Sequence, residues 1–150
     1  DNTTIFGLRA IIEAINSGST INKVYLQKGL REVYSLNKKA IKQEKITTSF
    51  VPVEKLDRLS KNNNHQGAVA QISPIEFADL EKLIETSLEA TDAPIFLILD
   101  QISDVRNFGA IIRTAECTGV DGIIIQQGGS APINAETIKT SAGAAFKLPI

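Results

Sequence analysis

The residues whose types and spacing could do chemistry lie between positions 100 and 115 of this 150-residue sequence. Here a run of five apolar residues, typical of a strand covered on both faces, gives way to a helical pattern. Ligands bind at that edge of an α/β sheet. Asn107 is placed to cap the helix, whose first free amides offer an anion site. Arg113 interrupts an apolar series, so its guanidinium must reach the sheet edge, a partner chain or solvent.

Each of these residues also has a purely structural interpretation. Asn107 could serve only as the helix cap, and Asp104 could only shape the loop before it. Arg113 could pair with Glu116, three residues later on the helix. Gly109 would let another backbone or a ligand approach closely under either interpretation. Residue type and spacing alone leave both interpretations open.

Other candidates for chemistry carry weaker signals. Cys117 lies in an apolar stretch, where a small core residue is expected rather than a nucleophile. The sequence QGGS at residues 127–130 lacks the Lys and Ser or Thr of a P-loop, so we interpret it as a loop at the sheet edge. The sequence has one histidine and one cysteine, which cannot build an ordinary zinc site or an internal disulfide. We therefore expect no metal and a reducing compartment, the cytoplasm.

Charge divides the sequence into two halves, although the net charge is only −1. Residues 1–72 contain 11 Lys/Arg and 6 Asp/Glu, a net +5, whereas residues 73–150 contain 5 and 11, a net −6. A basic half favours a polyanion partner, because basic side chains displace the counterions of phosphates. The alternative is that the four lysines between positions 38 and 45 only solvate one helix and its exit.

Alternating helical and strand patterns predict two α/β modules joined by a helical connector, residues 74–93. Residues 1–73 are expected to form a compact three-layer module. Its expected helices are residues 7–16, 31–43 and 53–59, and its expected strands are 24–26, 46–51 and 67–72. No apolar run approaches the roughly 20 residues that cross a bilayer, so no membrane partner is expected.

The second module, residues 94–150, has a β-α-β-α-β pattern that predicts right-handed parallel crossovers. The expected strands are residues 95–99, 122–125 and 146–150, and the expected helices are 107–118 and 135–141. Three strands are half of an open nucleotide-binding sheet, which typically holds about five or six. We therefore expect this sequence to be part of a longer protein.

Residues 104–115, DVRNFGAIIRTA, closely resemble the first signature of the SpoU (TrmH-type) RNA ribose 2′-O-methyltransferases of the SPOUT superfamily. Three further segments agree in the same order: IFGLRAIIEA at 5–14, NHQGAVA at 64–70, and TSAGAA at 140–145 before LPI at 148–150. The first two resemble the amino-terminal substrate-binding domain of the subfamily that modifies large-subunit ribosomal RNA. The resemblance spans essentially the whole chain.

The resemblance implies a fold and an assembly. Residues 1–73 would form a small three-layer α/β RNA-binding domain. Residues 94–150 would form the first half of a SPOUT methyltransferase domain, which has a Rossmann-like parallel sheet and a carboxy-terminal trefoil knot. The family acts as homodimers in which each site borrows from both chains.

The resemblance also implies that Asn107 and Arg113 are catalytic residues and that S-adenosylmethionine is the methyl donor. In that family the arginine contacts the RNA and helps to activate the ribose hydroxyl. Because a guanidinium does not deprotonate in a protein, we favour a charge-assisted role for Arg113. It would anchor the adjacent phosphate and stabilise the developing alkoxide. Asn107 would orient Arg113 or the ribose by hydrogen bonding.

RNA contacts are expected from Arg9, His65, Gln66, Arg106 and Arg113. For positions 65 and 66 the structural alternative is a turn that enters a strand. For Arg9 the alternative is solvation of the first helix. The expected partners are therefore RNA, of ribosomal origin, and a second copy of the chain.

The chain departs from the family pattern in two ways. Most relatives have proline where this chain has Val105, a change that should loosen the loop. The second and third family motifs, which supply a catalytic glutamate, the knot and most of the cofactor pocket, would lie beyond Ile150. We therefore expect the cofactor-binding residues there, and we predict that these 150 residues alone are unknotted and inactive.

The main alternative is a non-catalytic RNA-binding protein of the same architecture. It would keep both modules and never methylate. A small-molecule nucleotide-binding domain is disfavoured, because no ribose-binding acid follows a full glycine-rich turn.

Overall fold

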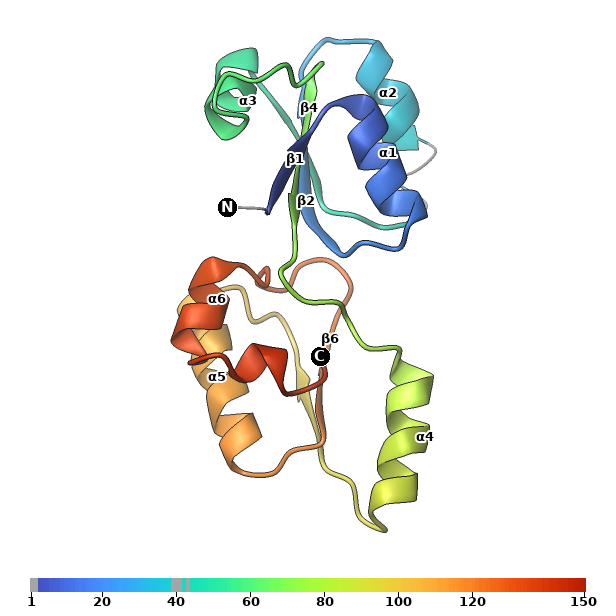
Figure 1. Cartoon of the computed structure of the whole chain (residues 1–150), viewed down its shortest axis with the longest axis vertical. Helices are drawn as coiled ribbons and strands as arrows, with labels where there is room; N and C mark the ends of the chain where they lie inside the picture. The colour runs from blue at the N-terminus through green and yellow to red at the C-terminus, as the bar shows by residue number, and fades with distance from the viewer. Residues whose placement is uncertain (1–2, 39–41, 43) are drawn as a thin grey trace. The chain divides into compact units, whose positions relative to one another are not determined.

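The computed structural model describes residues 3–38, 42 and 44–150 of the chain. Contacts divide the chain into two compact units, unit 1 (Asp1–Ser73) and unit 2 (Pro74–Ile150). Figure 1 shows the helices and strands of each unit. The residues expected to form a helical connector, 74–93, fall in unit 2.

Unit 1 contains a four-stranded mixed sheet with the strand order β1-β4-β2-β3. The strands β1 and β2 run antiparallel to β4, and β3 runs parallel to β2. Along the chain the elements are β1 (Thr4–Phe6), α1 (Leu8–Asn16), β2 (Ile21–Gln27), α2 (Glu32–Leu36), β3 (Thr48–Val51), α3 (Val53–Leu59) and β4 (Ala68–Ile72). The carboxyl ends of β1, β2 and β3 therefore meet the start of β4 at one end of the sheet.

Helices cover both faces of this sheet, which gives the three layers predicted from the sequence (Figure 1). On one face, Ile11 of α1 and Val33 of α2 are buried with Val24 of β2. On the other face, Leu56 of α3 is buried with Val69 of β4. Successive strand residues point to opposite faces, so one short strand such as β4 contributes side chains to the cores on both faces of the sheet.

Two elements of unit 1 differ from the prediction. The strand β1 was not predicted, because three residues directly before a helix are too few to show an alternating pattern. The α-helical part of α2 ends at Leu36, and Asn37 and Lys38 continue it as a π-helical turn, whereas the prediction continued the helix to residue 43. Residues 39–41 and 43 lie outside the described part of the chain, and Lys42 lies in a turn. Short helices depend on buried apolar contacts, and the residues directly after Leu36 are polar.

Unit 2 contains α4 (Leu80–Ala90) and a two-stranded parallel sheet of β5 (Phe96–Leu99) and β6 (Gly122–Ile125). The crossover between the strands is α5 (Val105–Cys117), and α6 (Ala135–Thr140) and the 3-10 helix η2 (Ala144–Phe146) follow. The core of unit 2 is apolar and includes Leu99, Phe108, Ile112, Ala115, Ile123, Ile133 and Leu148.

The strand predicted for residues 146–150 is wrong. Phe146 ends η2, and the residues after it form no strand. Pro149 has no N–H to donate to a ladder, which limits strand pairing here. Its carbonyl still accepts a hydrogen bond from the Ile123 N–H at 2.9 Å, so this segment lies beside β6.

Candidate functional site

The helix α5 begins at Val105, two residues earlier than predicted, and Asp104 is its N-cap. Asp104 has an extended backbone (φ −82°, ψ 121°), and its Oδ1 accepts a hydrogen bond from the Asn107 N–H at 2.7 Å. Aspartate is among the preferred N-cap residues, because its side chain satisfies a free amide of the first turn. The prediction that Asn107 caps this helix is therefore wrong. Asn107 lies in the first turn, and its side chain is exposed.

Val105 is the first residue of α5 rather than a loop residue. The N–H of a first helical residue has no partner within the helix, so proline is favoured there. The proline of the family pattern would thus occupy a position that suits it. Val105 instead packs half-buried against the core of unit 2. Val105 therefore lies in the helix and not in the loop before it, and a loosening effect of valine stays a prediction.

Gly109 allows α5 to lie directly against the end of α6. A Cβ at this position would overlap the Thr140 side chain and lie 3.1 Å from the backbone nitrogen of Ser141. The expected close approach at Gly109 is thus made by residues 140–141, which belong to another segment of the family resemblance. The sequence pattern identified both segments, and the structure places them in contact with each other.

The polar candidates of unit 2 share the exposed face of α5. The exposed residues of this helix are Arg106, Asn107, Ala110, Arg113, Thr114 and Cys117. Arg106 and Arg113 are seven residues apart, about two turns, so they lie on the same side of the helix. Cys117 follows Arg113 by four residues on that side, so the prediction of a core cysteine is wrong.

The guanidinium of Arg113 makes no ion pair or hydrogen bond within the described residues. The alternative that it pairs with Glu116 is therefore not observed. Arg106 approaches Glu136 of α6, with 3.7 Å between its Nε and the carboxylate Oε1, and its side chain is 81% exposed. An exposed pair of this length contributes little, so both arginines remain accessible.

In unit 1, His65 is buried and both of its ring nitrogens have partners. Its Nδ1 accepts a hydrogen bond from the Gly67 N–H at 2.9 Å, so the proton lies on Nε2. Nε2 donates to Oδ1 of Asp57 in α3 at 3.0 Å. With 8% of its surface exposed, His65 joins the loop before β4 to α3. A direct RNA contact by His65 stays a prediction, and this geometry gives it a positioning role.

The structure brings Gln66 to the start of α1. Gln66 is exposed, with a positive φ of 50°, and its Oε1 lies 3.2 Å from the place a Cβ on Gly7 would take. The Gly7 N–H donates to the carbonyl of Ala68 at 3.0 Å, which ties the start of α1 to β4. Arg9 is exposed in the first turn of α1. Gln66 and Arg9 thus border one surface of unit 1.

Two family models match this chain. Residues 94–150, which include α5 and its two arginines, match the SpoU rRNA methylase family. Residues 4–78 match a family described as RNA 2′-O ribose methyltransferase substrate binding. The chain belongs to the SpoU family. This confirms the resemblance inferred from residues 104–115 and the fold class that it implies.

The chain is similar to SpoU relatives that are longer. A protein of Staphylococcus haemolyticus, whose name places it in the TrmH family of tRNA/rRNA methyltransferases, is 38% identical over 152 residues. A protein of the same name from Staphylococcus aureus strain MSSA476 is 39% identical over 152 residues. Each match covers 100% of this chain and 60% of the relative. The chain thus spans about three fifths of their length.

Solved SpoU-type structures are similar over almost all of the chain. An AdoMet-bound rRNA methyltransferase from Sinorhizobium meliloti is 22% identical, with a TM-score of 0.43 over 99% of this chain and 52% of that one. The SpoU methyltransferase AviRb from Streptomyces viridochromogenes, solved with AdoMet, is 20% identical, with a TM-score of 0.42 over 97% of this chain and 51% of that one.

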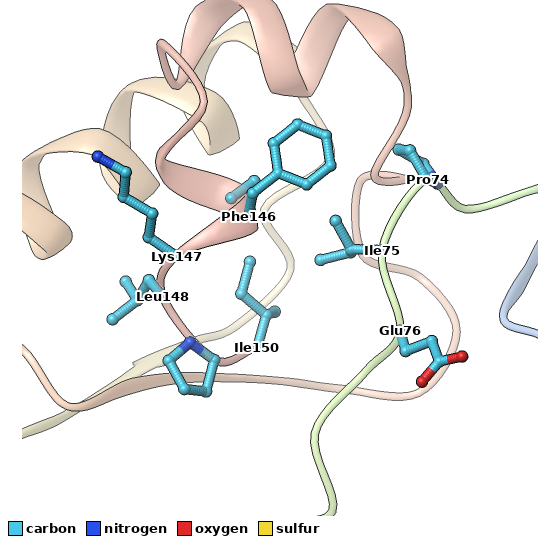
Figure 2. Close-up of a pocket in the computed structure, with 9 residues that line it drawn as sticks. Pro74, Ile75, Glu76, Phe146, Lys147, Leu148 and Ile150 are labelled. Atoms are coloured by element: carbon cyan, nitrogen blue, oxygen red, sulfur yellow. The ribbon is translucent and has the colours of Figure 1, made fainter.

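Unit 2 of this SpoU chain contains a cavity of about 400 Å³ between the segment 74–76 and the segment 145–150 (Figure 2). Its lining mixes apolar side chains, such as Ile75 and Phe146, with Glu76 and Lys147. Neither Asn107 nor Arg113 lines it. The cavity is therefore separate from the exposed face of α5.

Within the described residues, no buried side-chain nitrogen or oxygen lacks a hydrogen-bond partner. The same part of the chain has no group of three His, Cys, Asp or Glu side chains that could hold a metal. None of its helices is both long and apolar enough to cross a membrane.

Proposed function

We propose that the protein containing this chain methylates the 2′-hydroxyl of a ribose in large-subunit ribosomal RNA. The observation that carries the proposal is the exposed guanidinium of Arg113, which has no partner within the described residues and belongs to the family signature at residues 104–115. A cation with no protein partner is available for a phosphate oxygen, with which a guanidinium forms paired, charge-assisted hydrogen bonds.

Arg113 acts as an electrostatic group rather than as a base. An arginine guanidinium has N–H donors and no acceptor, so Arg113 cannot take up the proton of the ribose hydroxyl. It anchors the phosphate next to the target ribose, and a remaining N–H stabilises the negative charge that develops on the 2′-oxygen. The 2′-oxygen would bond to the methyl carbon as the carbon–sulfur bond of the methyl donor breaks, and the hydroxyl proton would pass to solvent water.

Asn107 acts on the RNA rather than on Arg113. Six residues separate the two, which is a rise of about 9 Å along the helix and a turn of about 120° around it. No hydrogen bond joins them within the described residues. The Asn107 amide can both donate and accept, which suits it to hold a ribose hydroxyl. This supports one of the two roles that the family resemblance allows.

The RNA is held in addition by unit 1 and by Arg106. Unit 1 has 11 basic and 6 acidic residues, and it presents Arg9 and Gln66 on one surface. His65 keeps Gln66 in place through its bonds to Gly67 and Asp57. Arg106 provides a second cation on the same side of α5 as Arg113.

We also propose S-adenosylmethionine as the methyl donor, with its binding residues beyond Ile150. One observation supports this placement: the relatives are longer than the matched region, which covers 60% of their length. The assembly we propose is a cytoplasmic homodimer in which Arg113 of one chain serves the cofactor held by the other.

The test measures methyl transfer from S-adenosylmethionine to ribosomal RNA fragments by the full-length protein. We expect Arg113→Ala to lower the rate by about 100- to 1000-fold, the usual effect of removing one donor to a developing oxyanion. The matched control is Lys82→Ala, because Lys82 is an exposed cation of α4 in the same unit that has no part in the proposed site, and its loss should leave the rate unchanged. An unchanged rate in Arg113→Ala would contradict the proposal. RNA binding by the wild type without methyl transfer would instead support the non-catalytic alternative.

A further inference from the structure

Two aromatic rings of unit 1 stack on each other at the surface. Tyr34 of α2 is 50% exposed and Phe50 of β3 is 40% exposed. Their ring centroids are 5.4 Å apart, and the planes meet at 26°. Rigidly held, exposed aromatic rings provide a surface on which a nucleic-acid base can stack.

Packing explains why these rings face outward. Val33 and Leu36 occupy the buried side of α2, so Tyr34 lies on its outer side. Val51 of β3 is buried with α3, and the preceding residue, Phe50, therefore points to the α2 face. In the described part of unit 1, β3 pairs with β2 alone and forms the edge of the sheet. The two rings thus lie at an open edge.

Basic residues flank the two rings. Arg31 precedes Tyr34 by three residues and Lys38 follows it by four, which places both on the same side of this helical segment. Lys28 donates its backbone N–H to the carbonyl of Val51 at 2.9 Å, next to the aromatic residue of β3. All three cations are exposed, and within the described residues none forms an ion pair. The surroundings therefore favour a negatively charged partner.

This surface adjoins the one that carries Arg9 and Gln66. The loop before β4 lies against the start of α2, since a Cβ on Gly67 would be 3.2 Å from Cγ1 of Val33. The Gln27 N–H also donates to the Gly67 carbonyl at 2.8 Å. Both surfaces thus lie at the end of the sheet where β1, β2 and β3 finish.

We propose that the Tyr34–Phe50 pair stacks an unpaired base of the RNA substrate, while Arg31 and Lys38 bind the flanking phosphates. The inference rests on the proposed function, from which it takes RNA as the substrate. It adds that the RNA bound by unit 1 includes a single-stranded segment. Bases of a duplex are already stacked on their neighbours, whereas unpaired bases can be splayed onto aromatic side chains.

The experiment measures binding of a fluorescein-labelled oligoadenylate of 12 nucleotides to the full-length protein by fluorescence anisotropy. We expect the double variant Tyr34→Leu, Phe50→Leu to bind about 5- to 100-fold more weakly, the loss that corresponds to one stacked base. Leucine keeps apolar volume at both positions while removing the rings. Ultraviolet crosslinking of a 5-iodouridine RNA, mapped by mass spectrometry, should identify Tyr34.

Three controls separate stacking from folding and from the proposed function. Tyr34→Phe keeps the ring and should retain affinity, and Phe77→Leu removes an exposed ring from unit 2 and should change nothing. Arg31→Gln with Lys38→Gln should reduce the salt dependence of binding, since each phosphate contact contributes about one unit of slope. Unchanged affinity in the double leucine variant, with RNA still methylated, would overturn this inference alone. Failure of the wild type to bind any RNA would overturn the proposed function as well.

Discussion

Gly109 determines how closely α5 can lie against α6. In an exposed helix, Gly→Ala would raise the free energy of unfolding by about 1 kcal/mol. Here the new Cβ would overlap Thr140, which is β-branched and cannot swing away freely. We therefore expect Gly109→Ala to lower the free energy of unfolding by about 1–3 kcal/mol, the usual cost of overpacking. Urea unfolding of the full-length protein, followed by circular dichroism, measures it.

A double-mutant cycle shows whether this contact is the cause. Thr140→Gly removes the overlapping side chain and should by itself cost only about 0.3 kcal/mol through helix propensity, because threonine lies at about 0.7 kcal/mol on a scale where glycine lies at about 1 kcal/mol. Combined with Gly109→Ala, it should restore part of the lost stability, so that the two changes are not additive. Gly109→Ala with a higher free energy of unfolding than the wild type would show that the helices do not meet there.

His65 shows why a single residue type does not reveal its role. The sequence presents its one histidine two residues before a glycine, where a turn that enters a strand is the favoured interpretation and an RNA contact is the alternative. What favours the structural role is the carboxylate of Asp57, eight residues earlier, which accepts a hydrogen bond from the Nε2–H of His65. No local pattern predicts that α3 turns Asp57 toward this loop. Arg113 could be predicted better, because a lone cation within an apolar helical series must face outward.

At the scale of elements, Asp104 decides where α5 begins. We expect Asp104→Ala to lower the free energy of unfolding by about 1 kcal/mol, because the Asn107 N–H then loses its acceptor. The first turn of α5, which carries Arg106 and Asn107, would be less stable, so the rate of methyl transfer should fall as well. Thermal unfolding and methyl-transfer rates of the full-length protein measure the two effects. Asp104→Asn keeps an acceptor oxygen and should behave like the wild type, whereas equal losses in both variants would assign the effect to charge.

Strong periodic patterns in the sequence predicted most of the helices and strands, whereas short or irregular segments were not predicted correctly. The pattern from Phe108 to Ala115 identified α5, whose apolar side is buried along a clear period, and the apolar run before Asp100 identified β5. The expected cover on both faces of β5 is not observed within the described residues, since Ile98 is 71% exposed. The start of α5 was misplaced, since asparagine and aspartate both cap helices and both occur within four residues. The expected strand after Phe146 failed because proline and a 3-10 turn interrupt an apolar run that resembles a strand.

At the scale of the whole molecule, charge and fold divide at the same place. The basic half of the sequence forms unit 1, and the acidic half forms unit 2. This arrangement suits a division of labour in which unit 1 supplies long-range attraction for RNA. Unit 2, which is otherwise acidic, would then bind RNA through a few local cations, above all Arg106 and Arg113.

The chain of residues 1–150 alone should bind RNA without methylating it. Its basic unit supplies the phosphate contacts, whereas the binding residues that we propose for the methyl donor lie outside it. We expect RNA affinity to fall about 10- to 100-fold between 50 and 200 mM salt, as a few phosphate contacts require. Filter binding at several salt concentrations measures this, and radiolabelled S-adenosylmethionine measures turnover. Robust methyl transfer by these residues would place the cofactor site within them, and RNA affinity independent of salt would remove the electrostatic role of unit 1.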